Sequence, residues 1–386
     1  MDTPKYRRIV TAPRQSFFLF GPRGVGKSTW ARDELKGAHR FDLLDEALYQ
    51  SLLADPSLFA EELRGVPKGS WVVVDEVQRI PALLNEVHRF IEERRLRFAL
   101  LGSSARKLKT AGTNLLAGRA VRKQMFPLVP AELEKDFALE TVLRFGSIPL
   151  VLTAPESKSV LEAYVQMYLK EEIRAEALVR NFPGFLRFLP IAALFHGQVI
   201  NVSGVARDSG TPRTTVGGYL DILEDTLLTF RLPAYEAKLR VRERKHPKLY
   251  WVDPGLVRAV KKQFGCVAAE ERGALLEGWV LTLLRAHGEE SELYDDIFYW
   301  APTQASNVEV DFLLQRGRRF LAIEVKSQAR YSTSMLSGLR AIGDLPKLAR
   351  RILLYGGTRS LKTSDGIEVW PLQRFSYTLE ADKIWP

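Results

Sequence analysis

The sequence predicts an α/β protein with more than one domain, and three observations support this fold class. The apolar run of residues 17–20 leads directly into a glycine-rich loop, as a buried parallel strand does before a helix. A second apolar run, residues 71–74, ends in two carboxylates. Near the carboxyl terminus, the segment QRGRR joins two stretches of alternating apolar and polar residues, which is typical of a β-hairpin.

Composition narrows the class of protein. The chain has 386 residues, 46% of them hydrophobic and 26% charged, which is ordinary for a globular protein of about two to four domains. It has no apolar stretch near the ~20 residues of a membrane span, and MDTPKYRRIVTAPRQ lacks the apolar core of a secretory signal. We therefore expect a cytoplasmic protein that does not engage a membrane. The single cysteine, Cys266, excludes an intrachain disulfide framework and a cysteine zinc cluster.

The net charge of the chain indicates what kind of molecule it binds. A net charge of +10 favours a polyanion such as nucleic acid, although solvated lysines and arginines also explain it.

The glycine-rich loop matches G-x-x-x-x-G-K-[ST], the pattern of a phosphate-binding P-loop. Glycines let backbone N–H groups turn toward phosphates, Lys27 reaches the β- and γ-phosphates of ATP, and Ser28 offers a hydroxyl to Mg²⁺. A glycine-rich turn with a solvated lysine is the alternative. The residues expected to hold the nucleotide are Gly21, Pro22, Arg23, Gly24, Val25, Gly26, Lys27, Ser28 and Thr29.

The carboxylates of Asp75 and Glu76 end the second apolar run. Beside a P-loop, Asp75 would hold Mg²⁺ through water, and Glu76 would orient and deprotonate the water that attacks ATP. Acidic pairs at strand ends are common, so this assignment depends on the P-loop. A third strand, within LRFALLGSSARKL, ends in Ser103 and Ser104. A hydroxyl there could touch the γ-phosphate or the water, and a helix cap explains these serines almost equally well.

Helical periodicity begins at about Pro130. PAELEKDFALETVLRF and SKSVLEAYVQMYLKEEIRAEALVRNF predict helices that form a lid on the P-loop domain. The next segment, INVSGVARDSGTPRTTVGGYLDILEDTLLTFRL, predicts a helix-turn-helix followed by a wing strand. We expect Arg207, Arg213 and Thr214 to contact DNA. Protein contacts are the alternative role of this segment.

The carboxyl-terminal hairpin brings charged residues together. Counting outward from a turn with Gly317 first places Asp311 opposite Glu324, and Lys326 on the same face as Glu324. Such a set binds Mg²⁺ through the two carboxylates while Lys326 positions a water or stabilises charge. Glu277, on the otherwise apolar helix GALLEGWVLTLLRAH, needs a cation or another partner.

Together, Glu277, Asp311, Glu324 and Lys326 resemble the signature of PD-(D/E)xK nucleases. A solvated surface hairpin is a poor alternative, because it would set like charges opposite each other. A folded but inactive nuclease core, used as a DNA-binding or assembly platform, is a better one.

Over nearly its whole length the chain resembles AAA+ ATPases, and among them prokaryotic ATPases with a C-terminal DUF4143 domain. The motifs concerned are GPRGVGKST, VVVDEVQRIP, LLGSSARKL, LAGRAVRKQMFPLVPAEL, LLEGWVLTLL, NVEVDFLL and IEVKS. The resemblance implies a homo-oligomer, expected as a hexameric ring, in which a neighbouring subunit supplies an arginine to each ATP. Arg119 lies where this family places that arginine, Arg106 is the second candidate, and an ordinary surface arginine is the alternative. A second-sensor arginine is not assigned, because the segment RFGSIPLVL offers only Arg144 near the expected position.

Four parts are therefore expected. These are a P-loop AAA+ core (1–130), a helical lid (131–190), a winged-helix-like module (191–240) and a restriction-endonuclease-like α/β domain (241–386). With ATP and Mg²⁺ as cofactors, we expect an ATP-hydrolysing motor that binds and remodels or translocates double-stranded or branched DNA. An ATP-regulated, Mg²⁺-dependent DNA endonuclease is the alternative, and protein remodelling without DNA is a third.

Overall fold

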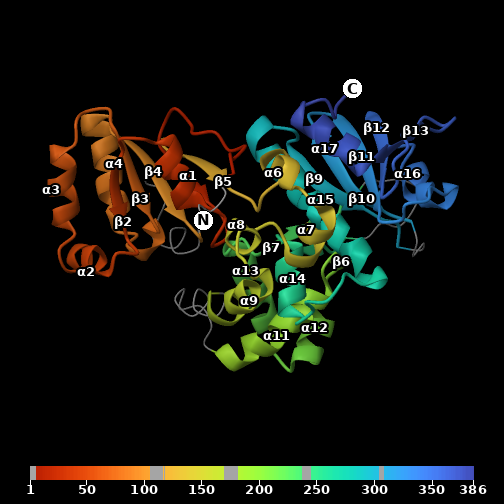
Figure 1. Ribbon diagram of the computed structural model, residues 1–386, viewed down its shortest axis with the longest axis horizontal. Coiled ribbons are helices and arrows are strands. Elements are labelled where there is room, and N and C mark those ends of the chain that lie inside the picture. The colour runs from red at the N-terminus through yellow and green to blue at the C-terminus, as the bar shows by residue number, and fades with distance from the viewer. Residues whose placement is uncertain (1–5, 105–115, 117, 169–180, 237–244, 304–307) are drawn as a thin grey trace. The chain divides into compact units, whose positions relative to one another are not determined.

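The computed structural model describes residues 6–104, 116, 118–168, 181–236, 245–303 and 308–386. The chain forms two compact units (Figure 1). The smaller unit comprises residues 7–126 together with 225–228, and the larger unit contains the other described residues. Residues 225–228 thus return to the smaller unit from within the sequence of the larger one.

The smaller unit is built on a parallel sheet of five strands in the order β2-β3-β4-β1-β5. The strands are β1 (Phe17–Phe20), β2 (His39–Asp42), β3 (Trp71–Asp75), β4 (Arg97–Gly102) and β5 (Val121–Gln124). The helices are α1 (Lys27–Glu34), α2 (Glu46–Ala54), α3 (Ser57–Gly65) and α4 (Leu83–Arg94), with a 3₁₀ turn η1 (Val77–Arg79). The three strands predicted from the apolar runs are confirmed, and β1 lies beside β4, which lies beside β3.

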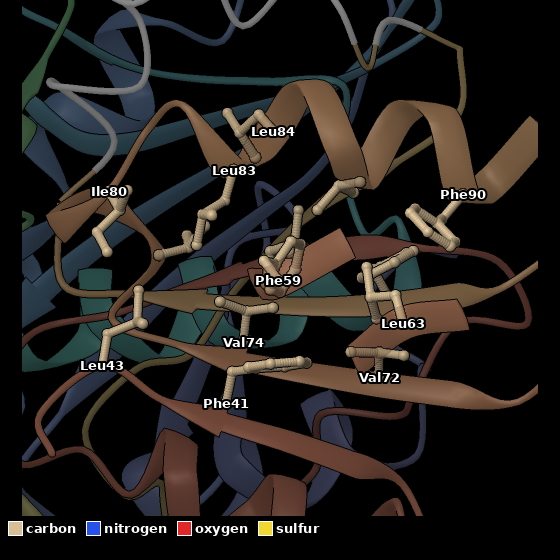
Figure 2. Packing of buried hydrophobic residues seen from close by; sticks show 14 of the residues in the cluster. Phe41, Leu43, Phe59, Leu63, Val72, Val74, Ile80, Leu83, Leu84 and Phe90 are labelled. Atoms are coloured by element: carbon tan, nitrogen blue, oxygen red, sulfur yellow. The ribbon is translucent and has the colours of Figure 1, made fainter. Parts of the chain in front are cut away.

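Helices cover both faces of this sheet, which explains why its central strands are continuously apolar. On one face, Phe18 and Val74 pack against residues of α3 and α4, while on the other Phe17 and Val73 pack against Trp30 of α1. Figure 2 shows the first of these layers, with Phe59 and Leu63 of α3 and Leu83, Leu84 and Phe90 of α4 beside Val72 and Val74 of β3.

Short helices open the larger unit. They are α6 (Pro130–Leu133), α7 (Leu139–Phe145), α8 (Pro149–Leu152) and α9 (Ser157–Ala163), with η3 (Glu134–Asp136) and η4 (Tyr164–Tyr168). The role of this segment as a lid on the P-loop domain stays a prediction, and its contacts place it in the larger unit. The reason is a long-range contact: the end of α7 meets the start of α14 (Pro254–Val260) so closely that a Cβ on Gly255 would lie 2.1 Å from the carbonyl oxygen of Phe145.

A small antiparallel sheet follows. Its strands, β6 (Gln198–Val199), β7 (Thr229–Leu232) and β8 (Lys248–Trp251), lie in the order β6-β8-β7. Three helices accompany it: α11 (Phe182–Leu194), α12 (Val202–Ser209) and α13 (Arg213–Asp225). We call these six elements the three-stranded module. Its strand β8 lies beyond residue 240, where the sequence placed the module's end.

The remaining sheet is mixed and has six strands, in the order β13-β14-β12-β11-β10-β9. Its strands are β9 (Asp296–Trp300), β10 (Val310–Arg316), β11 (Arg319–Lys326), β12 (Leu348–Tyr355), β13 (Leu361–Lys362) and β14 (Glu368–Pro371). The accompanying helices are α15 (Ala269–Ser291), α16 (Ser337–Ala341) and α17 (Leu372–Glu380), with η5 (Thr333–Leu336). In the ranges that the structure describes, no helix has the length and apolar character needed to cross a membrane.

The predicted hairpin is confirmed as β10 and β11. Arg316 pairs with Arg319 across the two-residue turn, and Gly317 there has φ of +59°. Phe312 pairs with Ile323 in the same register, and Asp311 and Glu324 are the next residues outward on the two strands.

His196 is a buried histidine at the contact between the three-stranded module and α15. Its ring lies so close to Gly278 that a Cβ there would be 2.4 Å away, and its Nδ1 accepts a hydrogen bond of 3.0 Å from the Trp251 N–H. Burial lowers the pKa of His196 to about 3 from its ordinary 6.5. The imidazole is therefore neutral in the folded protein at physiological pH.

Acid should destabilise the protein through this residue. Between pH 6.5 and about 3 the unfolded chain binds a proton at His196 that the folded chain does not, so stability falls as pH falls. From pH 7 to pH 5 the expected loss is about 2 kcal/mol in the free energy of unfolding. Urea denaturation at both pH values should show this loss in wild type and a smaller one in His196→Gln, whose amide can still accept the Trp251 hydrogen bond. Equal losses in the two proteins would contradict the assignment.

Candidate functional site

The P-loop connects β1 to α1, and its shape depends on glycines. A Cβ on Gly21 would lie 2.5 Å from the carbonyl oxygen of Met125, so only glycine fits there without a shift. Gly24 and Gly26 have φ of +79° and +94°, in the left-handed region that favours glycine. Val25 is fully buried in the core and anchors the loop. The loop backbone is thereby set for a ligand that approaches closely.

Lys27 opens α1 and is almost completely buried. Its ammonium donates hydrogen bonds to the carbonyl oxygens of Gly21 at 2.8 Å and Pro22 at 3.3 Å. Sequence reasoning missed Arg8, whose guanidinium donates to the carbonyl oxygens of Val25 and Phe126 and so fastens the loop to the end of β5. Arg8 lies outside every motif, and its sequence context carries no signal of this role.

Ser28 and Asp75 meet beside the loop. The Ser28 hydroxyl hydrogen-bonds the carboxyl group of Asp75, which ends β3. Burial raises the pKa of Asp75 above its ordinary value, while the Ser28 hydroxyl and the Lys27 ammonium act in the opposite direction. A hydroxyl and a carboxylate at a P-loop are the oxygen ligands that Mg²⁺ takes beside ATP, so the residues present fit this ion.

Glu76 follows in a left-handed backbone conformation with φ of +54°. The amide of Gln78 donates to the Glu76 carboxylate and also to the Ser103 hydroxyl at 3.0 Å, and that hydroxyl lies 3.4 Å from Glu76 Oε2. The carboxyl ends of β3 and β4 thus bring Glu76 and Ser103 together through Gln78. Gln78 was not among the predicted residues, although a polar residue two positions after an acidic pair is a usable signal.

The other expected loop residues differ in exposure. Thr29 is exposed, and its hydroxyl accepts a hydrogen bond of 3.4 Å from Arg32. Arg23 is half-buried, and Pro22 is buried with its carbonyl oxygen accepting from Lys27.

The arginines considered for the nucleotide site lie in different parts of the chain. Arg119 is half-exposed and forms an ion pair with Glu92 of α4. Arg106 lies outside the described residues. Arg144, in α7, donates hydrogen bonds of 3.2 and 3.3 Å to the carbonyl oxygen of Phe264 within the larger unit.

The three residues expected to contact DNA are all exposed. Arg207, near the end of α12, has a side chain that is 81% exposed and pairs with Asp208 at 3.0 Å. Arg213 and Thr214 stand at the start of α13. The helix pair therefore presents two arginines and a hydroxyl to solvent.

The acidic residues of the mixed sheet form a buried group around a lysine that the sequence analysis did not consider. Lys248 of β8 has a side chain that is only 2% exposed. Its ammonium lies 3.0 Å from Glu277 Oε1, 3.2 Å from Glu309 Oε2 and 3.5 Å from Asp311 Oδ1. We call Lys248 and the carboxylates of Glu277, Glu309, Asp311 and Glu324 the acidic cluster.

Other contacts complete this arrangement. The Tyr250 hydroxyl donates to Glu277, and the Val325 N–H donates to Asp311 Oδ2 at 2.8 Å. Lys326 pairs with Glu324. The hairpin therefore sets Asp311 and Glu324 side by side as counted from its turn, but different ammonium groups bind them.

Burial and neighbouring charge shift the pKa values of these groups. Burial, and then the Glu277 carboxylate, raise the pKa of Asp311 to about 6. Burial, and then Asp311, raise the pKa of Glu324 well above its ordinary value. Burial alone would lower the pKa of Lys248, but Glu277 and other acidic neighbours raise it well above the ordinary value, so the ammonium stays charged.

The second Mg²⁺ site, expected on Glu277, Asp311 and Glu324, does not fit this geometry. An ammonium lies among the oxygens that would have to face a metal ion. Within the described ranges, no group of three or more His, Cys, Asp or Glu residues is arranged to hold one. We derive no chemical step through a metal at this cluster.

Comparison with known families divides the chain into three consecutive parts. An AAA domain matches residues 13–134, a domain of unknown function (DUF8612) matches 136–265, and another (DUF4143) matches 272–375. An uncharacterized protein of Mycobacterium tuberculosis is 30% identical over 95% of this chain and 82% of its own length. The chain belongs to the AAA-domain ATPases with a C-terminal DUF4143 domain.

Two further comparisons are more distant. An uncharacterized protein of Haemophilus influenzae is 23% identical over 82% of this chain and 81% of its own length. Among solved structures, RuvB of Thermotoga maritima is 16% identical over 57% of this chain and 82% of its own, with a TM-score of 0.27. That structural likeness is distant.

Proposed function

We propose that the chain hydrolyses ATP at its P-loop and uses the energy, as a homo-oligomer, to remodel or translocate double-stranded or branched DNA. One observation carries the proposal: Lys27, Ser28 and Asp75 are in mutual contact or electrostatic range, with Glu76 next in the chain. This supports hydrolysis as well as binding, because it combines phosphate-binding groups with a carboxylate suited to act as a base.

Each residue has a distinct role in the proposed reaction. Lys27 exchanges the carbonyl oxygens of its own loop for phosphate oxygens, and the amino terminus of α1 adds N–H donors. Ser28 and Asp75 hold Mg²⁺, which neutralises charge on the phosphates when bound. Glu76 orients the attacking water and takes its proton, while Gln78 and Ser103 position the Glu76 carboxylate.

The ATPase assignment predicts two different defects. Lys27→Ala should abolish nucleotide binding, because the main phosphate-binding charge is lost. Glu76→Gln should still bind ATP but lose turnover by a factor of roughly 10² or more, because the base is lost while the Gln side chain keeps a similar shape. Fluorescent-nucleotide titration and phosphate release measure the two effects separately. Normal turnover by Glu76→Gln would show that Glu76 is not the base.

We propose further that Arg119 acts on the ATP of a neighbouring subunit in a hexameric ring. Its exposure and its pairing with the surface residue Glu92 are compatible with transfer to a partner. The family supplies the precedent for such an arginine.

Subunit mixing tests this arrangement. Arg119→Ala and Lys27→Ala subunits should each be inactive alone, and their mixture should recover part of the ATPase rate, since an intact P-loop can meet an intact arginine. The control is a mixture of Lys27→Ala with Glu76→Gln, which damages the same half of every site and should recover nothing. Full-rate hydrolysis by demonstrably monomeric protein would refute a trans arginine.

The DNA part of the proposal is supported by the three-stranded module. Its order of elements, α11-β6-α12-α13-β7-β8, with sheet order β6-β8-β7, is that of a winged helix. The net charge of +10 and the exposed Arg207 and Arg213 suit a phosphate backbone. An endonuclease is not proposed, because the acidic cluster does not fit a metal ion.

Replacing Arg207 and Arg213 together by Ala should weaken DNA binding and reduce the slope of log K against log salt by about 1 for each phosphate that the variant no longer neutralises. Fluorescence anisotropy with linear, forked and four-way DNA at several salt concentrations measures this. Arg340→Ala is the matched control, because Arg340 is a half-exposed arginine of the mixed-sheet region that pairs with Asp365. A double variant with the wild-type salt slope would move the DNA site elsewhere.

A further inference from the structure

The acidic cluster resembles a nuclease centre in composition and differs from one in its resident cation. We propose that Lys248 permanently takes the place of the metal ion, so that the cluster binds no divalent cation and serves to fasten the three-stranded module to the mixed sheet. This inference does not depend on the proposed ATPase activity, which concerns the other unit.

The number of contacts supports an ammonium as the intended occupant. A lysine ammonium has three N–H donors and no acceptor. Three oxygens from three different residues, Glu277, Glu309 and Asp311, lie within 3.5 Å of Lys248 Nζ. Three carboxylate oxygens are thus in ion-pair range of the ammonium, and the oxygen of Glu277 also accepts a hydrogen bond from it.

The two ammonium groups also weaken the attraction of the cluster for a metal ion. Lys248 is buried and keeps its positive charge, and Lys326 supplies a second ammonium beside Glu324. Each ammonium offsets one of the four carboxylate charges that a divalent ion would meet, in surroundings that screen charge poorly. It would also have to compete for carboxylates whose oxygens already accept hydrogen bonds from Tyr250 and Val325.

One carboxylate oxygen of the cluster, Oε2 of Glu324, is still able to accept a further partner. Glu324 is only 3% exposed, and its buried Oε2 has no hydrogen-bond partner among the residues that the structure describes. A buried unpaired oxygen is uncommon, and it is tolerated here with Lys326 on the other oxygen of the same carboxyl group. Removing Lys248 would release three carboxylates that now share one cation, and carboxylate oxygens are ligands that Mn²⁺ accepts.

The cluster joins distant parts of the chain. Lys248 belongs to β8 of the three-stranded module, Glu277 to α15, and Asp311 and Glu324 to β10 and β11. An isolated lysine in that volume would be costly to bury, as would the carboxylates without it. The ion pairs between Lys248 and these carboxylates therefore hold β8 against the mixed sheet.

The first experiment uses the full chain without nucleotide and measures Mn²⁺ binding by electron paramagnetic resonance. Wild type and Asp311→Asn should bind Mn²⁺ equally, because Asp311 is engaged by Lys248 and takes no part in any metal site. A wild-type Mn²⁺ site of one per chain that disappears in Asp311→Asn would overturn the proposal.

The second experiment removes the ammonium. Lys248→Met should gain one Mn²⁺ per chain, at least tenfold tighter than any wild-type binding, and Mn²⁺ should raise its melting temperature without changing that of wild type. Lys248→Gln, which keeps hydrogen-bond donors without the charge, is a second variant in case the Met variant does not fold. Asp311→Asn added to either variant should abolish the gain.

The matched control is Lys245→Met, because Lys245 is a nearby lysine that is 70% exposed and pairs with Glu236. It should leave Mn²⁺ binding at the wild-type level. If folded Lys248 variants gain no Mn²⁺ site, or if Lys245→Met gains the same one, the place of the metal has not been taken by Lys248 and the proposal is wrong.

Discussion

A buried positive charge on β8 sets the arrangement of the larger unit. Lys248 must keep carboxylates around it, and Glu277, Glu309 and Asp311 must keep a cation among them, so strand, helix and hairpin are held at one place. Two alternate residues of β8, Lys248 and Tyr250, both bind Glu277 of α15. Five residues beyond Lys248, Asp253 caps α14 and accepts the Ser147 N–H at 2.7 Å. The segment from Lys248 to Asp253 thus contacts α15, the mixed sheet and the chain at Ser147.

The two lysine sites use the same side chain in opposite ways. Lys27 binds carbonyl oxygens of its own loop, which are neutral acceptors, so an anionic phosphate can replace them favourably. Lys248 already binds anionic carboxylates, so exchanging them for a phosphate would bring no comparable gain in electrostatic energy. Among the carboxylates, Asp75 accepts a hydrogen bond from the Ser28 hydroxyl, whereas Asp311 lies 3.5 Å from the Lys248 ammonium.

Features set by local sequence were predictable, and features set by distant contacts were not. The strand before the P-loop follows from its apolar run, and the hairpin register follows from a two-residue turn. The cation that binds the acidic residues could not be predicted. Lys248 lies in the stretch KLYW, which gives no indication of the sheet that the lysine faces. The helices after Pro130 were recognised as helices, but their packing depends on Gly255 and Asp253, more than a hundred residues away.

The return of residues 225–228 to the smaller unit has a mechanical consequence. Leu227 packs in the apolar layer with Phe98 and Val74, while the chain before it is α13 and the chain after it is β7. A helix and a strand of the module are thus tied through four residues to the sheet that carries the P-loop. An excised fragment ending at residue 126 would therefore lack Leu227, a piece of its own apolar interior.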